Sequence, residues 1–182
     1  VFLSASSCTS VRYLSQATAG QLSLTWNRRP VEKVLSDPSV PERTRALLRK
    51  IPEIKAYGEK GGLKPTTNYQ DYVELGRVAP VWVVSACEKL AFRARTWWFP
   101  VVGGFTYLGW FEEKAARDHA ADLALEGWDV DVRAARAYST LGWFRDSVLS
   151  SMIPSGPDAL AELANVVLHE SVHATLYIPS QS

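Results

Sequence analysis

The middle of the chain constrains the fold most, because β-branched and aromatic residues concentrate there. Residues 81–86 (VWVVSA) and 91–99 (AFRARTWWF) each predict a strand. In the second strand the alternating set is Phe92, Ala94, Thr96 and Trp98. Residues 101–111 (VVGGFTYLGWF) are also predicted to be extended, with a bulge or a close backbone approach at Gly103 and Gly104.

Helical patterns flank this block on both sides. Helices are predicted at residues 10–26, 30–35, 41–50, 112–126 and 157–177. A further strand is predicted at 129–138, and the Gly- and Pro-rich stretch 58–65 predicts a loop. The order of helices, strands, helix, strand and helix predicts an α+β domain with a small mixed or antiparallel sheet.

Composition narrows the class of protein. With 182 residues, of which 47% are hydrophobic and 21% charged, the chain is long enough for one soluble globular domain. The formal net charge of +1 gives no indication of nucleic-acid binding. No run of about 18 apolar residues occurs, so no transmembrane helix is predicted.

The N-terminal residues match the end of a bacterial lipoprotein signal peptide. An apolar run that ends in small residues (VFLSASS) precedes Cys8, the position where such a signal is cleaved and lipid is attached. On this interpretation residues 1–7 are the tail of a signal, residues 8–182 form the mature domain, and Cys8 is lipidated. The alternative is an ordinary N-terminal cysteine. Because the chain begins with Val1 instead of methionine, we expect it to be part of a longer protein.

The predicted helix at 157–177 carries three ionisable residues in an apolar segment, LANVVLHESVHATLYI. Its leucines and valines lie around nearly the whole circumference, which predicts a buried helix. His169 and His173 are four residues apart and share one face, so both imidazoles can reach one tetrahedral ion. Glu170, rotated by about 100°, can reach a water molecule on that ion. This is the HExxH arrangement of zinc peptidases, and the alternative is a chance match.

A catalytic zinc ion needs a third protein ligand. The metzincin pattern would place glycine at 176 and histidine at 179, but the chain has Leu176 and Pro179, so that subclass is excluded. His119, the remaining histidine, is predicted to be a surface residue. We therefore expect the gluzincin arrangement, with a glutamate on a helix roughly ten to thirty residues after Ser182 as the third ligand.

Four stretches of the sequence are SVRYLSQATAGQLSL, WWFPVVGGFTYLGWF, AYSTLGWF followed by VLSSM, and LHESVHATLYI. Together they resemble the bacterial predicted-aminopeptidase family, a group of zinc-dependent lipoproteins with an HExxH helix. The resemblance implies a zincin-like fold, with His169 and His173 as metal ligands and Glu170 as the catalytic glutamate. The family's third ligand, the glutamate of a phenylalanine-asparagine-glutamate motif, has no counterpart in the chain. Arg145 and Ser147 depart from the acidic pair and proline expected after GWF.

The resemblance implies hydrolysis of peptide substrates with Zn²⁺ as cofactor. Glu170 would take a proton from the attacking water and pass it to the leaving amine. The protein would lie in the bacterial cell envelope, on the periplasmic side, associated with the membrane through lipid on Cys8 only. Asn165 could orient His169, or it could make a cap or core hydrogen bond.

The sequence leaves open which residues bind the substrate backbone and which stabilise the oxyanion. Either residues 101–107 (VVGGFTY) or the strand at 129–138 could pair with the substrate backbone. Either Tyr107 or Tyr138 could stabilise the oxyanion, or both could be buried, hydrogen-bonded tyrosines.

The alternative function, from a different class of protein, is that of a non-catalytic envelope lipoprotein that uses a zincin-like scaffold to bind a partner. Its tryptophans would then line an interaction surface. Glu170 argues for the enzyme, because a protein without catalysis has no need of a general base at this position.

Overall fold

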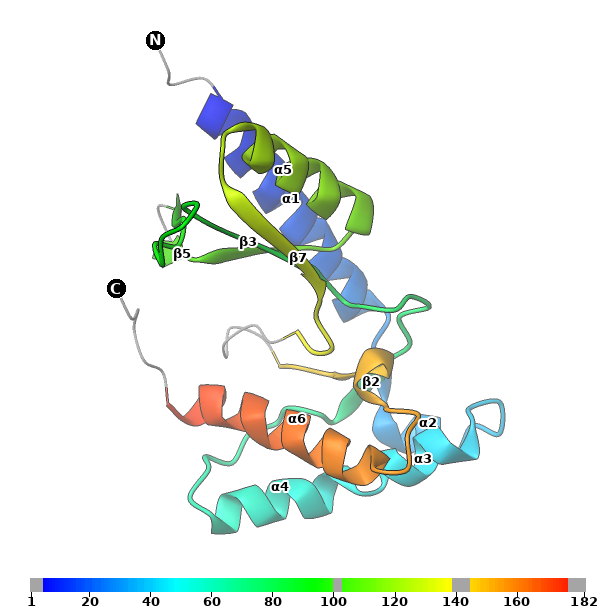
Figure 1. Cartoon of the computed structure of the whole chain (residues 1–182). Helices are drawn as coiled ribbons and strands as arrows, with labels where there is room; N and C mark the ends of the chain where they lie inside the picture. The colour runs from blue at the N-terminus through cyan, green and yellow to red at the C-terminus, as the bar shows by residue number, and fades with distance from the viewer. Residues whose placement is uncertain (1–4, 100–102, 139–144, 177–182) are drawn as a thin grey trace. The chain divides into compact units, whose positions relative to one another are not determined.

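The computed structural model describes residues 5–99, 103–138 and 145–176, with side chains from Tyr13 onward. Backbone contacts divide the chain into two compact units (Figure 1). Unit 1 comprises residues 1–26 and 79–135, and unit 2 comprises residues 27–78 and 136–182. Each unit is therefore built from two stretches that are separated in the sequence. Among the described residues, no helix is long and apolar enough to span a lipid bilayer.

Within the residues that the structure describes, unit 1 contains two helices and five strands. They are α1 (Ala5–Trp26), β3 (Trp82–Cys87), β4 (Trp97–Phe99), β5 (Gly103–Phe105), β6 (Tyr107–Trp110), α5 (Glu113–Leu125) and β7 (Asp129–Ala134). Strand β3 lies between β6 and β7 in an antiparallel sheet, and β4 and β5 form a separate antiparallel pair. Helix α5 packs on the β6–β3–β7 sheet, and α1 contacts β6.

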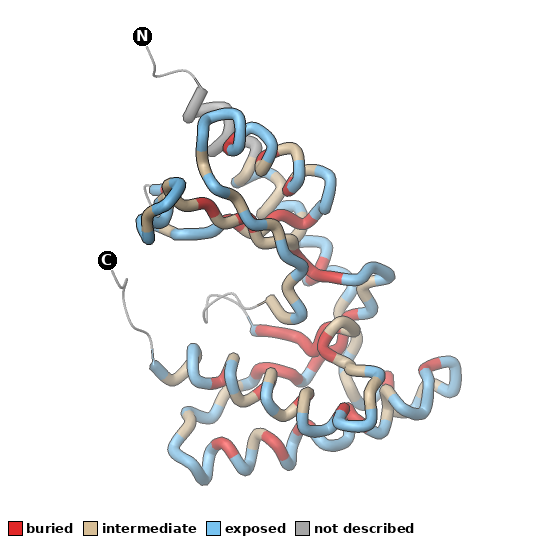
Figure 2. Tube along the Cα trace, in the orientation of Figure 1, coloured by how far each residue is buried: buried red, intermediate tan, exposed pale blue. Residues whose placement is uncertain are grey.

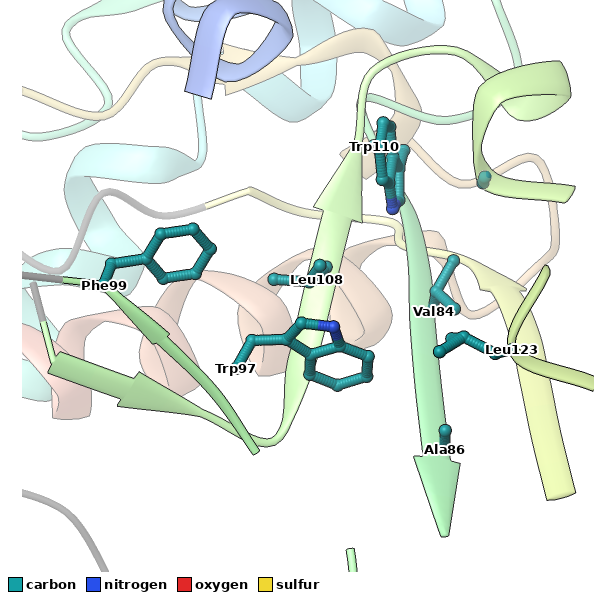
Figure 3. Packing of buried hydrophobic residues seen from close by; sticks show 8 residues of the cluster. Val84, Ala86, Trp97, Phe99, Leu108, Trp110 and Leu123 are labelled. Atoms are coloured by element: carbon teal, nitrogen blue, oxygen red, sulfur yellow. The ribbon is translucent and has the colours of Figure 1, made fainter. Parts of the chain in front are cut away.

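The core of unit 1 joins these elements through apolar side chains (Figure 3). Its buried members are Val84, Ala86, Trp97, Phe99, Leu108, Trp110, Ala116 and Leu123. Figure 2 shows buried residues on the strands of this unit and on one side of α5. Trp110 is only 1% exposed, so at least part of the high tryptophan content serves packing.

Two predictions for unit 1 are wrong. His119 is buried, and its ring centroid lies 5.2 Å from that of Trp110 and 6.1 Å from that of Trp97. It lies on the inner face of α5 with Ala116 and Leu123, where its flat ring packs on the indoles.

The strand predicted at residues 91–99 is also wrong in extent, because only Trp97–Phe99 form a strand. Trp97 and Phe99 are buried, whereas Phe92 and Trp98 are exposed. Apolar residues occupy both faces of this segment, so alternation alone could not show which face is buried.

Unit 2 contains four α-helices, three short strands and a 3₁₀ turn within its described residues. They are β1 (Arg29–Pro30), α2 (Val31–Leu35), α3 (Glu42–Leu48), α4 (Ile51–Lys60), β2 (Asp71–Val73), β8 (Val148–Leu149), the turn Ser150–Met152 and α6 (Ala159–Thr175). Strand β2 pairs antiparallel with β1 and parallel with β8. Helices α4 and α6 lie side by side (Figure 1).

The loop predicted around Gly58 is wrong in part, because α4 continues through this residue to Lys60. A Cβ atom at Gly58 would lie 2.7 Å from the Leu168 side chain of α6. Gly58 thus lies inside a helix and faces α6, and it does not form a turn. The prediction of an α+β fold is confirmed, although the strands form three small sheets instead of one.

Candidate functional site

Helix α6 carries the histidine pair, and only one side of this helix is buried. The buried positions Ala159, Leu163, Val167 and Ser171 recur every four residues, which is the spacing of one helix face. On other sides, Leu160 and Val172 are 46% and 38% exposed. The prediction of a helix buried all round is therefore wrong. Helix α4, its main packing partner, covers a single face of it.

His169 and His173 lie together on an exposed part of α6. Their Nε2 atoms are 3.3 Å apart, and their rings meet edge to face with centroids 4.9 Å apart. Two imidazole nitrogens that bind one tetrahedral zinc ion at about 2.0–2.1 Å are about 3.3 Å apart. The pair therefore has the separation that such an ion requires, as the spacing of four residues predicted.

Glu170 is half-buried beside the two histidines. Burial raises the pKa of its carboxyl above the ordinary value, and the negative charge of Asp146 acts in the same direction. The imidazoles of His169 and His173 oppose this rise. Glu170 thus combines partial burial with two neighbouring imidazoles, which is the environment of a candidate general base.

A buried polar cluster lies within electrostatic range of Glu170. The backbone N–H of Asp146 donates to Asn68 Oδ1 at 3.1 Å, and the backbone N–H of Tyr69 donates to the Asp146 carbonyl at 2.7 Å. All three residues are at least nine-tenths buried. Burial raises the pKa of the Tyr69 hydroxyl, and the charges of Glu170 and Asp146 add to this rise.

Helix α4 holds the segment before this cluster in place. Lys55 Nζ donates to the carbonyl oxygens of Thr66 at 2.6 Å and Asn68 at 3.0 Å. Tyr69 has a φ of 69°, an uncommon conformation for a residue with a side chain. Sequence reasoning missed Asn68 and Tyr69, because they follow the predicted loop in a segment without helical or strand periodicity.

The residues that depart from the family pattern have clear structural positions. The Arg145 guanidinium pairs with the carboxylate of Asp71 on β2. The Asp71 side chain is 9% exposed, so Arg145 compensates a nearly buried negative charge. Ser147 is also buried, next to the start of β8. Arg145 therefore links this segment to β2 within unit 2.

The remaining predicted site residues are placed as follows. Asn165 is exposed on α6, so the expectation of a core hydrogen bond is wrong. Tyr138 is half-buried in unit 2, while Tyr107 is 50% exposed in unit 1. Strands β5, β6 and β7 belong to unit 1 and α6 to unit 2, so a role for those strands beside the histidines stays a prediction.

The two cysteines lie in unit 1. Cys87 is a free, half-buried thiol at the end of β3. Cys8 lies in α1, and its side chain is outside the described ones, so lipidation stays a prediction.

A groove with a cavity volume of about 590 Å³ runs between α4 and α6. On α6 its apolar lining comes from Leu160, Ala161, Ala164 and Leu168. Leu160, Ala164 and Leu168 recur every four residues and are rotated by about 100° from His169 and His173. Ala161 lies two turns before His169 in the row of positions four residues apart that contains the histidines, so the groove borders this row at the start of α6.

Within the described ranges, no three His, Cys, Asp or Glu side chains come together as a metal site. His169 and His173 fit a zinc ion as two of its ligands, and no described residue supplies the third. The two imidazoles alone are an incomplete shell for a catalytic zinc ion.

Comparison with known proteins places the chain in a family. The model of the family described as "Putative aminopeptidase" matches residues 12–182. No curated protein and no solved structure matches the chain. Because the family model covers nearly all of its length, the chain belongs to this family.

Proposed function

We propose that this member of the aminopeptidase family is a zinc-dependent peptidase of the gluzincin type, with a zincin-like fold around α6. His169 and His173 would hold the ion, and Glu170 would be the general base. The observation that carries the proposal is the 3.3 Å separation of the two Nε2 atoms, with the Glu170 carboxyl next to them in the chain. The family match supports peptide substrates and an aminopeptidase activity.

When bound, the zinc ion would supply Lewis-acid chemistry that acidifies water and polarises the scissile carbonyl. His169 and His173 would each present a neutral Nε2 to it, with the proton on Nδ1. A Glu170 carboxylate oxygen would accept a proton from the attacking water and then donate it to the leaving amine. The third ligand would be a glutamate from outside the described residues.

We also propose that the protein is a lipoprotein of the bacterial envelope, anchored on the periplasmic side through Cys8. The support for this is the VFLSASS sequence before Cys8. Several acyl chains on one cysteine hold a protein firmly, whereas one chain anchors it only weakly. Replacement of Cys8 by serine should prevent lipidation in the intact protein.

The deciding experiment replaces Glu170 by glutamine in the intact protein. Glutamine keeps the shape but cannot accept the proton, so hydrolysis of a dipeptide should fall by about 10²–10⁴-fold while zinc content stays unchanged. The control is Glu162→Gln on the same helix, where Glu162 pairs with Arg136 at 2.8 Å, and it should keep activity. Wild-type hydrolysis by Glu170→Gln would refute the assignment of the base.

The alternative is a non-catalytic envelope lipoprotein that binds a partner. It is favoured by the exposure of Trp26 (79%) and Trp98 (68%), because exposed aromatic residues are typical of interaction surfaces. An intact, zinc-loaded protein that hydrolyses no peptide, with either a free or an acetylated N-terminus, would support this alternative. Cleavage of free peptides but not acetylated ones would establish an aminopeptidase.

A further inference from the structure

The β6–β3–β7 sheet of unit 1 has two edges, and they differ in what covers them. At the β6 edge, the Gln16 side chain of α1 donates to the Gly109 carbonyl at 3.1 Å and accepts from the Phe111 N–H at 2.9 Å. At the other edge, no described strand pairs with the outer side of β7. None of the six residues of β7 is buried (Figure 2). Within the described residues, β7 is thus the open edge, and such an edge can pair with another strand.

The ladder with β3 shows which backbone groups of β7 face outward. Ala135 N–H donates to the Val81 carbonyl at 3.0 Å, so these two residues form a hydrogen-bonded pair of the antiparallel ladder. Since such pairs alternate along antiparallel strands, the odd-numbered residues of β7 also direct their backbone groups to β3. The N–H and C=O groups that point away from β3 therefore belong to Val130, Val132 and Ala134.

The side chains of β7 alternate between two faces. Val130 and Val132 pack against the core of unit 1. Asp129, Asp131 and Arg133 are exposed on the opposite face. The Asp131 carboxylate and the Arg133 guanidinium are 4.0 Å apart, and their side chains are 62% and 70% exposed. Both charges are therefore within reach of a strand that pairs with β7.

These charges are complementary to a second copy of β7 in one antiparallel register. When Val132 lies opposite its own counterpart, Asp131 of each copy lies opposite Arg133 of the other. Asp129 then lies opposite Ala135, which has no charge. A shift by two residues in either direction places Asp131 opposite Asp131 or Arg133 opposite Arg133, and like charges that face each other are destabilising. The strand thus selects itself as a partner, in a defined register.

We infer that β7 pairs with β7 of a second copy of the chain, so that two β6–β3–β7 sheets join across a two-fold axis. The pairs Val132–Val132 and Val130–Ala134 would exchange backbone hydrogen bonds, and the valines would continue the apolar core across the axis. The interface uses no residue of α6, so it is independent of the proposed peptidase chemistry. A single strand pair is a small interface, so the dissociation constant should be on the order of 100 µM.

The test is sedimentation velocity of the chain at concentrations around this constant, under reducing conditions that keep Cys87 free. The wild type should shift from monomer to dimer as its concentration rises. Asp131→Arg and Arg133→Asp should each weaken association by at least about tenfold, because like charges then face each other. An equimolar mixture of the two single variants should recover the dimer, because every arginine then lies opposite an aspartate. Misfolding of either variant cannot produce this rescue.

The matched control is Asp129→Asn, which removes a charge from the same face and should leave association unchanged. Hydrogen exchange measured by NMR gives a second readout. The amides of Val130, Val132 and Ala134 should gain protection as the concentration rises, whereas that of Asp131, already bonded to β3, should not change. A wild-type chain that is monomeric at about 1 mM would overturn the inference, as would a mixture of the single variants that does not associate. Protection of the same amides by a peptide substrate, without a dimer, would assign the edge to the substrate instead.

Discussion

At the scale of single residues, unit 2 contains a nearly buried charge that an ion pair compensates. Asp71 lies on β2 with a nearly buried carboxylate, and Arg145 pairs with it from a distant part of the chain. Removing one partner of such a pair leaves the other without compensation, which costs more than the pair itself contributes. Arg145 is 42% exposed, so water reduces this cost.

Arg145→Met should therefore destabilise the protein by about 1–3 kcal/mol, measured by urea unfolding. Asp71→Asn in the same chain should recover most of the loss, because the uncompensated charge is then gone. Arg145→Lys keeps the charge and should cost less than Arg145→Met. Equal stability of Arg145→Met and the wild type would mean that the ion pair does not form.

The carboxyl group of Asp37 makes the stability of the folded state depend on pH. It accepts hydrogen bonds from the Ser39 hydroxyl at 2.6 Å and from Arg29 at 2.5 Å. These bonds, the one from Ser39 first, lower the pKa of Asp37 from 3.8 to about 2. A lowered pKa means that the folded state favours the carboxylate. The stabilisation is thus complete above 3.8 and is lost as the pH falls towards about 2.

The urea midpoint of the wild type should fall more steeply between about pH 5 and about pH 2 than that of Asp37→Asn. Ser39→Ala removes the donor with the largest effect, so it should give an intermediate slope. Parallel curves for all three proteins would contradict this account of Asp37.

The site residues show what sequence can predict at this scale. The shared face of His169 and His173 followed from their spacing, because helix geometry fixes it. The exposure of this face did not follow, because it depends on which element packs against α6. The charge of Asp146 acts on Glu170 only because the tertiary fold brings them within electrostatic range, and no local sequence pattern predicts this.

At the scale of elements, two helical glycines have different packing environments. A Cβ atom at Gly20 in α1 would lie 2.2 Å from the Phe111 ring. At Gly58 in α4 it would meet the end of the Leu168 side chain at 2.7 Å and that of Leu63 at 2.9 Å. A leucine end can rotate away, whereas a packed ring in contact with the helix backbone cannot.

Gly20→Ala should destabilise the protein by about 1–3 kcal/mol, even though alanine favours a helix. Gly58→Ala should lie within about 1 kcal/mol of the wild type, because the gain in helix propensity offsets a small shift of the leucines. Thermal unfolding of both variants checks the order. Phe111→Leu should reduce the effect of Gly20→Ala, and an unchanged effect would show that α1 does not pack through this contact.

Element prediction succeeded where patterns are long. Helices α1, α5 and α6 and strand β3 were expected, because each has a sustained composition or period. Strands β1, β2 and β8 have only two or three residues, which is too few to show an alternation of apolar and polar residues. They exist because a partner strand satisfies their backbone groups, which is information from elsewhere in the chain.

At the scale of the whole molecule, each unit combines segments that are far apart in the sequence. Residues 79–135 and 1–26 make up unit 1, while unit 2 closes through the parallel pairing of Tyr72 in β2 with Val148 in β8. Pairings at such separations leave no periodic trace in the sequence. The α+β class was predictable from the order of the expected helices and strands, but this division into units was not.

The last prediction concerns the stability of the intact protein in the presence of zinc. An ion that binds only the folded chain stabilises it, by about 1.4 kcal/mol for each tenfold rise in free zinc above its dissociation constant. For a chain of this size the melting temperature should rise by about 3–5 °C per tenfold step.

The rise should vanish in His169→Ala/His173→Ala, because those two Nε2 atoms lie 3.3 Å apart only in folded α6. Magnesium, which prefers oxygen ligands, should give no such rise. In hydrogen exchange, zinc should slow α6 and its neighbour α4 the most, because the ion would bind on α6. If zinc raises the melting temperature of the double variant as much as that of the wild type, the ion is not bound by these histidines.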